Sequence, residues 1–253
     1  MITAYHRPKT LDEALALLSK PNRQPLGGGT LLSKPGADPV EAVDLQALSL
    51  DSIVRRGDHL EIGATVTLQN LLVSIHCSEA LKSALKLEAP LNLRNSATTA
   101  GTLVSCDGRS TFATVLLALD ARLELRVSKE EVMVSSIGEF LPLRPRGLIT
   151  SITLPLNTKL AFDTVSRTPA DKPIICAAIA QWNSGRTRLA LGGYGTSPLL
   201  AIDGTEAGGI ETAAKNAFHE AADDYASAEY RMEAGATLAR RCLSMLTSTD
   251  IKG

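Results

Sequence analysis

Two stretches rich in glycine and threonine contain the residues of this chain best suited to binding an anion. The first comprises Leu26, Gly27, Gly28, Gly29, Thr30, Leu31 and Leu32. The second runs from Leu93 to Thr102, and its last five residues are Thr98, Thr99, Ala100, Gly101 and Thr102. Turns of small residues expose backbone N–H groups and let a ligand approach the main chain. Where such a turn leads into a helix N-terminus, free donors and the helix dipole favour phosphate. We therefore predict that the two stretches bind one diphosphate.

Other reactive groups are scattered along the chain. The histidines, which stand at positions 6, 59, 76 and 219, suggest no Ser–His–Asp constellation. The cysteines, at positions 77, 106, 176 and 242, form no C-x-x-C pair and have no histidine at metal-ligand spacing. A zinc or iron–sulfur site held by this chain alone is therefore not expected. Isolated cysteines are typical of reduced thiols in a cytosolic protein.

The composition is that of a globular protein. The chain has 253 residues, 44% of them hydrophobic and 21% charged, which suits one large domain or two ordinary ones. A net charge of −1 without a basic block argues against a nucleic-acid surface. The N-terminus has no apolar signal-peptide core, and the longest apolar run, Ile174 to Ala180, is too short for a membrane span. A cytoplasmic location is the default expectation.

The elements that must position the two stretches can be read from local patterns. Thr10 and Thr67 each precede an apolar helical stripe and are expected helix caps. A further helix is expected over 80–89, and a buried helix is expected after the second stretch, at 115–121. Strands are expected at 2–5, 40–45, 60–64, 122–127, 132–134 and 147–155.

We place the main domain boundary near Asn157. Residues 1–157 would form the ligand-binding domain, with two α/β subdomains split near 50–60. Residues 158–253 would form a small α+β domain. Its predicted elements are a three-stranded antiparallel sheet, from strands at 161–167, 174–182 and 187–191, and helices at 210–222 and 228–246.

Several motifs occur in an order that resembles one family. They are Gly27–Leu32, Leu93–Thr102, Leu116–Ala121 (sequence LLALDA), Arg167–Asp171, Leu189–Gly195 and Ser227–Arg231. Together they resemble the FAD-binding (medium) subunit of molybdenum hydroxylases of the carbon monoxide dehydrogenase and xanthine dehydrogenase type. The resemblance implies an α+β chain. Its two-domain FAD-binding fold would be of the vanillyl-alcohol-oxidase (PCMH) type, followed by a C-terminal domain of the carbon monoxide dehydrogenase flavoprotein type.

The resemblance also implies roles for the two stretches. Leu26 to Leu32, Asn95 and Thr98 to Thr102 would bind the FAD diphosphate, with the hydroxyls of Thr98, Thr99 and Thr102 as further donors. Ala100 stands where the family has the first of two glycines. If that position needs a positive φ, alanine costs about 1 kcal/mol. Thr102 replaces the family's asparagine or serine.

Four further positions carry expectations from the family. Its acidic ligand of the adenosine part aligns with Thr111, and Asp107 either replaces it or is an ordinary turn residue before Gly108. Ile149 would lie against the flavin ring, or simply in the core. Lys172 would place a cation near the flavin, or would be a solvated loop lysine.

The implied function is electron transfer within a complex. A molybdopterin-binding large subunit would oxidise the substrate, and a [2Fe–2S] small subunit would pass electrons to FAD here and on to an acceptor such as NAD⁺ or a quinone. The alternative is a degenerate scaffold subunit that binds FAD weakly or not at all. Ala100, Thr111 and the absence of the family's lysine at Phe162–Val165 favour that alternative. A free-standing FAD oxidoreductase that uses a nicotinamide directly is a third hypothesis.

Overall fold

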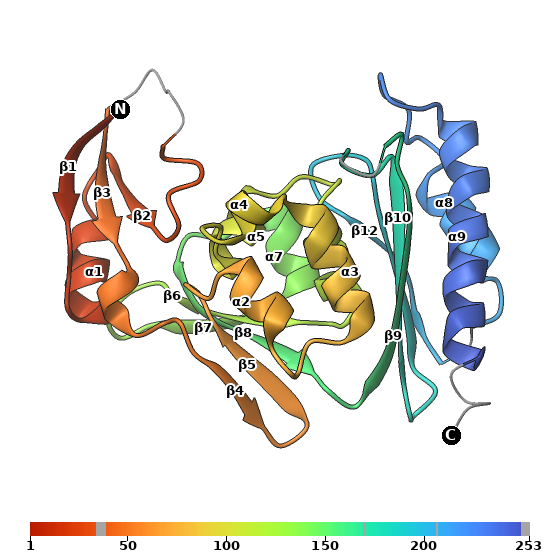
Figure 1. Cartoon of the computed structure of the whole chain (residues 1–253), viewed down its shortest axis with the longest axis horizontal. Coiled ribbons are helices and arrows are strands. Elements are labelled where there is room, and N and C mark those ends of the chain that lie inside the picture. Colours follow the sequence, from red (N-terminus) through yellow and green to blue (C-terminus); the bar gives the residue numbers. More distant parts are fainter. Residues whose placement is uncertain (34–38, 169–170, 206, 249–253) are drawn as a thin grey trace.

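The computed structural model describes residues 1–33, 39–168, 171–205 and 207–248, and its described strands form three sheets. At one end of the molecule, three parallel strands pair in the order β1-β3-β2 (Figure 1). They are β1 (Ile2–His6), β2 (Arg23–Leu26) and β3 (Val40–Asp44). Helix α1 (Leu11–Leu18) joins β1 to β2, and the hydroxyl of Thr10 accepts a hydrogen bond from the Glu13 N–H. The expected cap at Thr10 is confirmed.

The second sheet is antiparallel and has the strand order β4-β5-β8-β6-β7. Its inward side chains, such as Leu60, Leu123 and Ile152, are fully buried, while the alternate residues are more exposed. The strands are β4 (Ile53–Arg56), β5 (His59–Gly63), β6 (Arg122–Arg126), β7 (Val132–Ser136) and β8 (Leu148–Pro155). β4 was not predicted, because only Ile53 of its four residues is shielded from solvent and no alternation results.

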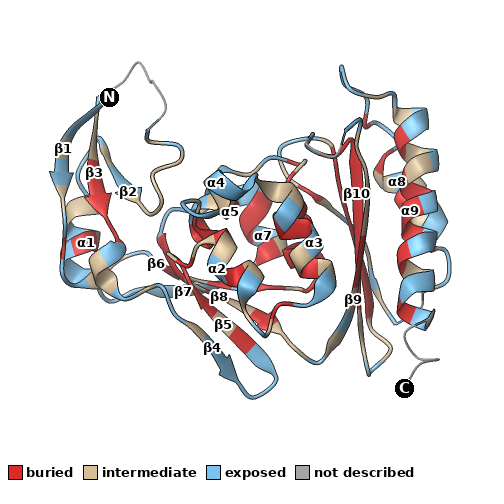
Figure 2. Ribbon diagram, in the orientation of Figure 1, coloured by how far each residue is buried: buried red, intermediate tan, exposed pale blue. Residues whose placement is uncertain are grey.

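Helices cover the inner face of this second sheet. They are α2 (Leu68–Val73), α3 (Glu79–Glu88), α4 (Leu91–Arg94), α5 (Thr99–Ser105), α6 (Thr111–Ala118) and α7 (Ile137–Leu143). Thr67 caps α2 as expected. All eight residues of α6 are buried, because α6 contacts α3 on one side and β10 and β11 of the third sheet on another. Figure 2 shows buried residues concentrated in this central region and on β10.

The third sheet has four antiparallel strands, in the order β12-β11-β10-β9. They are β9 (Thr158–Val165), β10 (Ile175–Trp182), β11 (Thr187–Gly192) and β12 (Leu199–Gly204). Helices α8 (Ile210–Ala217) and α9 (Ala228–Ser248) cover its far face (Figure 1). The prediction of three strands was therefore wrong. The missed strand, β12, lies at an edge and has no buried residue, so its burial does not alternate.

A buried arginine ties the third sheet to α6. Arg188 is 4% exposed and lies 3.0 Å from the Asp120 carboxylate after α6 and 2.6 Å from the Asp203 carboxylate of β12. Its Nη2 also donates to the carbonyl of Leu117. Among the helices that the structure describes, none is both long and apolar enough to cross a bilayer.

Candidate functional site

The two glycine- and threonine-rich stretches meet at one cavity of about 350 Å³ between the first and second sheets. The loop after β2, the first turn of α5 and the start of β8 all contribute to its wall. Of the predicted site residues, the structure brings together Leu26, Gly27, Gly28, Gly29, Thr30, Leu31, Leu32, Thr98, Ala100, Gly101 and Ile149. It places Asn95, Thr99, Thr102, Asp107, Thr111 and Lys172 outside this wall.

The glycines of the first loop allow it to pack against the second stretch. A Cβ on Gly28 would lie 1.6 Å from the carbonyl oxygen of Ser96, and one on Gly27 would lie 2.8 Å from Oγ1 of Thr98. Gly29 has φ +71°, which glycine adopts without strain. Close approach of the two loops to each other therefore explains Gly27 and Gly28, where the sequence had suggested close approach of a ligand.

The first loop has unused hydrogen-bond donors. The Ser33 N–H bonds the Gly29 carbonyl, and the Leu45 N–H bonds the Leu26 carbonyl. Within the described part of the chain, the N–H groups from Gly27 to Leu32 have no acceptor. Backbone donors without an internal partner suit an anionic group, because each needs an acceptor from water or a ligand. This loop fits the predicted diphosphate site.

The second stretch differs from the prediction, because it is the start of helix α5 and its N–H groups are already bonded. The Thr99 N–H donates to the Val66 carbonyl at 2.8 Å, and the Ala100 N–H donates to the Ala64 carbonyl at 3.3 Å. The Gly101 N–H donates to the Thr98 hydroxyl at 3.2 Å. The expectation of a second set of free backbone donors is therefore wrong.

Two of the three threonine hydroxyls are also occupied. Thr99 is fully buried and donates to the Gly63 carbonyl at 3.1 Å. Thr102 donates to the Thr98 carbonyl at 2.8 Å within the helix. The Thr98 hydroxyl accepts from Gly101 and keeps its own proton for a further acceptor. Thr98 is therefore the one of these threonines whose hydroxyl is placed to reach a ligand in the cavity.

Ala100 is not strained. It lies in the first turn of α5, it does not have a positive φ, and it is 9% exposed among the apolar core residues. Alanine is preferred to glycine in a helix. The condition for a cost of alanine, a positive φ at this position, is therefore not met, because the position is helical rather than part of an irregular turn.

Apolar side chains form much of the remaining wall. Ile149 is 3% exposed and reaches the cavity from β8, together with its neighbour Leu148. The sequence had not indicated Gln24, Pro25, Leu45, Ala64, Thr65, Val104, Gly147 or Leu148. Gln24 and Pro25 precede Leu26 in sequence, and Gly147 and Leu148 precede Ile149. Leu45 and the Ala64–Thr65 pair adjoin no predicted site residue and reach the cavity only through the fold.

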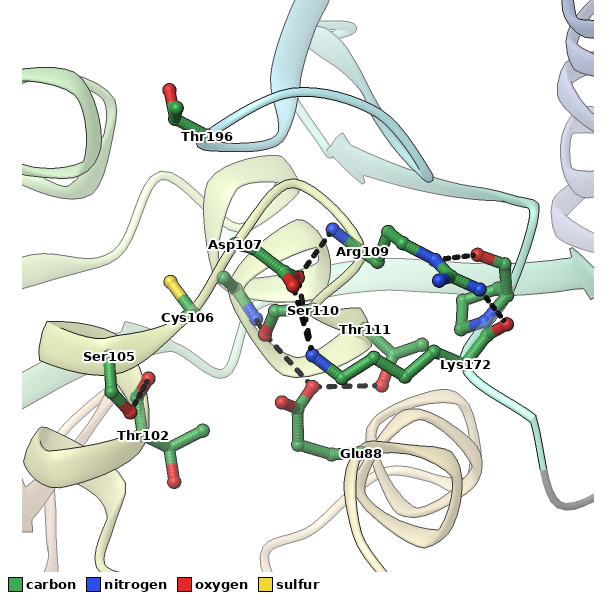
Figure 3. Close-up of polar contacts among 12 residues, drawn as sticks. Glu88, Thr102, Ser105, Cys106, Asp107, Arg109, Ser110, Thr111, Lys172 and Thr196 are labelled. Carbon is green, nitrogen blue, oxygen red and sulfur yellow. Dashed lines mark hydrogen bonds and ion pairs between the residues drawn. The ribbon is translucent and has the colours of Figure 1, made fainter. Parts of the chain in front are cut away.

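Asp107 and Lys172 form an ion pair beyond the end of α5, with Nζ 3.2 Å from the carboxylate (Figure 3). Both side chains are about half exposed. Arg109 fastens the two loops together by donating to the carbonyl of Lys172 at 2.6 Å and to that of Pro173 at 3.0 Å. Its guanidinium also lies 4.1 Å from the Tyr225 ring centroid. Lys172 is thus paired with Asp107, where the loop after α5 contacts the loop that precedes β10. In the neighbouring family motif, Pro169 and Ala170 lie outside the described residues.

Thr111 is fully buried and its hydroxyl donates to the Ala84 carbonyl at 2.7 Å, so it is not free for a ligand. A carboxylate nevertheless lies beside it. Glu88 Oε2, on α3, accepts a hydrogen bond from the Ser110 hydroxyl at 2.9 Å (Figure 3). It also accepts one from the Phe112 N–H at 2.9 Å. Sequence reasoning missed Glu88 because it lies 23 residues before Thr111. Asn95 follows α4 and is exposed.

Arg144 holds the far end of α5. This residue has φ 42°, and its guanidinium donates to the carbonyls of Leu103, Val104 and Cys106 and to that of Thr196. Burial raises the pKa of the Cys106 thiol, although the adjacent Arg144 acts in the opposite direction. The helix that supplies one wall of the cavity is therefore fixed at both ends by specific hydrogen bonds.

Comparisons with known proteins show which family and which fold the chain resembles. A family model described as the FAD binding domain in molybdopterin dehydrogenase matches residues 1–157. The chain is 30% identical over 241 residues to the uncharacterized protein YgfM of Escherichia coli K12, covering 91% of each chain. It is 27% identical over 199 residues to the carbon monoxide dehydrogenase medium chain of Afipia carboxidovorans, covering 72% of this chain and 69% of that one. A chain in the structure of reconstituted carbon monoxide dehydrogenase from Oligotropha carboxidovorans superposes with a TM-score of 0.82, at 25% identity and 97% coverage of both chains.

Proposed function

The chain belongs to the family of FAD binding domains in molybdopterin dehydrogenase, and from this premise we propose that it is the electron-transfer flavoprotein subunit of a molybdenum-containing hydroxylase. FAD is its cofactor. The observation that supports the proposal most directly is the cavity. It combines a loop whose N–H groups have no acceptor among the described residues with an apolar wall, and a dinucleotide with a charged centre and planar rings needs both.

We assign the holding of the cofactor to particular residues. The N–H groups of Gly28 to Leu32 and the hydroxyl of Thr98 would bind the diphosphate. Ile149 and Leu148 would contact a ring and exclude water from it. When bound, FAD supplies the capacity to accept and release electrons, and the chain contributes binding, orientation and a low-dielectric wall.

The remaining parts of the proposal concern other chains. The relative named as a medium chain suggests an assembly of subunits. We propose a molybdopterin-binding large subunit and a [2Fe–2S] small subunit as partners, with NAD⁺ or a quinone as acceptor. The domain division at Asn157 is also proposed. It is supported by the passage from β8, which ends at Pro155 in the second sheet, to β9, which begins at Thr158 in the third.

The scaffold alternative is not favoured. Two of the three sequence features behind it change meaning in the structure. Ala100 is an unstrained helical residue, and Thr111 lies outside the cavity wall with its hydroxyl bonded to the Ala84 carbonyl. Neither departure therefore removes a donor from the cavity.

A pair of leucine substitutions tests FAD binding at this cavity. Leu31 is 49% exposed and lines the cavity, whereas Leu91 is 57% exposed and does not. Leu31→Asp places a negative charge beside the proposed diphosphate, and repulsion across a few ångströms of partly solvated space costs about 1–2 kcal/mol. FAD titration followed by flavin fluorescence quenching should show about 5- to 30-fold weaker binding for Leu31→Asp and unchanged binding for Leu91→Asp.

The proposal fails if the purified chain has no flavin absorbance and does not quench added FAD. Equal affinities of the two aspartate variants would contradict the assignment of the Gly27–Leu32 loop, even if FAD binds elsewhere on the chain.

A further inference from the structure

A second cleft lies beside the cofactor cavity. Its volume is about 690 Å³, and it lies between the end of α1, the first turn after β6 and the start of β8. Pro25, Gly147 and Leu148 line both spaces, so the cleft and the cavity share a wall. Of the residues that line this cleft, the proposed FAD site uses Leu148 alone.

The charged side chains that line the cleft are all cationic within the described chain: Lys20, Arg23, Arg126 and Arg146. This concentration is unusual in a chain whose net charge is −1. Arg23 is balanced by Glu41 at 2.6 Å, and Arg126 lies 3.8 Å from Glu124. Among the described residues, the side chains of Lys20 and Arg146 have no ion-pair partner. Lys20 and Arg146 therefore give the cleft two positive charges that no carboxylate of the described residues balances.

Two guanidinium nitrogens at the cleft lack an acceptor. Nη1 of Arg23 and Nε of Arg126 are buried and have no hydrogen-bond partner among the described residues. A buried charged donor without an acceptor is energetically unfavourable. An oxyanion in the cleft would relieve this cost after rotation of these side chains, and arginine suits phosphate because it can donate two parallel hydrogen bonds.

Apolar side chains form much of the remaining lining, together with the polar residues Ser19 and Asn22. Leu15 and Leu18 contribute from α1, and Val127 and Leu148 from the second sheet. The volume lies within the range of small-molecule sites, and inorganic phosphate alone would leave most of it unfilled. An apolar surface next to clustered arginines matches a ligand with a phosphate at one end and a planar ring at the other.

We propose that this cleft is a second ligand site, which binds a phosphate-bearing nucleotide between Arg126 and Arg146 on one side and the α1 leucines on the other. This inference does not rest on FAD binding in the neighbouring cavity. The ligand would bridge Arg23 of the first sheet and Arg126 of the second, the two sheets that flank the cofactor cavity.

Calorimetric titration of AMP, adenosine and inorganic phosphate into the FAD-saturated full chain, in low-salt buffer without phosphate, tests the proposal. We expect AMP to bind and adenosine to bind at least about tenfold more weakly, because the charged hydrogen bonds are lost. Arg146→Gln should weaken AMP by about tenfold. The matched control is Arg55→Gln, on exposed β4 and away from the cleft, and it should leave AMP binding unchanged.

Three results would overturn the proposal. The first is equal affinity for AMP and adenosine, and the second is unchanged AMP binding in Arg146→Gln. The third is AMP binding that disappears when FAD saturates the chain, because that result would assign the cleft to the FAD site. If the chain does not take up FAD, the same titrations on the flavin-free chain remain decisive. AMP binding should then survive Leu31→Asp, which acts on the other cavity, and fall in Arg146→Gln.

Discussion

Ala100→Gly separates the helical interpretation of the second stretch from the loop interpretation. If Ala100 stood in a strained turn, glycine would stabilise the chain and improve the anion site. In the structure Ala100 is a buried residue of the first turn of α5, and its N–H already bonds the Ala64 carbonyl. Glycine at this position should therefore destabilise the fold without improving FAD binding.

The magnitude follows from two terms. Glycine in a helix costs about 1 kcal/mol relative to alanine, with less expected near a terminus. Removal of one buried methyl group costs about 0.8 kcal/mol. The sum is about 1–2 kcal/mol, and for a chain of this size it corresponds to a fall in melting temperature of about 2–8 °C.

Urea unfolding of the flavin-free chain, followed by circular dichroism, measures the effect. Ala16→Gly, at an exposed position within α1, is the control that contains the helix-propensity term alone, so it should cost less than Ala100→Gly. A variant Ala100→Gly that is as stable as the wild type, or that binds FAD more than about threefold tighter, would refute the helical account of this stretch.

Four further predictions follow from the contacts. Gly28→Ala should lower both the melting temperature and the FAD affinity, because its Cβ would overlap a backbone carbonyl. The control Gly57→Ala has φ +63° and open space around it, so it should lower the stability measured in a thermal melt by only about 1 kcal/mol. Arg144→Met should destabilise the chain by about 2–3 kcal/mol in urea, because the carbonyls that end α5 lose a charged donor. The Arg186 guanidinium, together with Arg188, lowers the pKa of Asp203, so this carboxylate stabilises the fold above about pH 4 and its contribution is lost as the pH falls further. Urea midpoints should therefore fall less steeply for Asp203→Asn than for the wild type in that acid range, and parallel curves would contradict the pairing. Burial raises the pKa of three thiols to about 12, so a thiol reagent should leave them unmodified until denaturant is added: Cys77, Cys176 and Cys242.

Much of the fold could be predicted from local patterns in the sequence. Caps at Thr10 and Thr67, strands with clean alternation such as Arg122–Arg126, and the apolar helix before Asp120 were recognised because each carries its own signal. The family and its cofactor were also accessible, since several motifs in a fixed order are specific even where each alone is weak. β4 and β12 were missed because neither strand has the alternation of a strand buried on one face.

The candidate site divides differently. The glycine run predicted the Gly27–Leu32 loop from the sequence alone, and the family resemblance implied Ile149; both line the cavity. Tertiary structure decided how the donors are used. Contacts with the segment from Gly63 to Val66, far from Thr99 in the chain, occupy the donors that the second stretch was expected to offer. Tertiary structure also placed the Glu88 carboxylate beside Thr111 at the start of α6, and it brought Arg23 and Arg126 to one cleft. A residue's chemistry is encoded in its type, but its availability depends on which distant groups the fold places within hydrogen-bond distance.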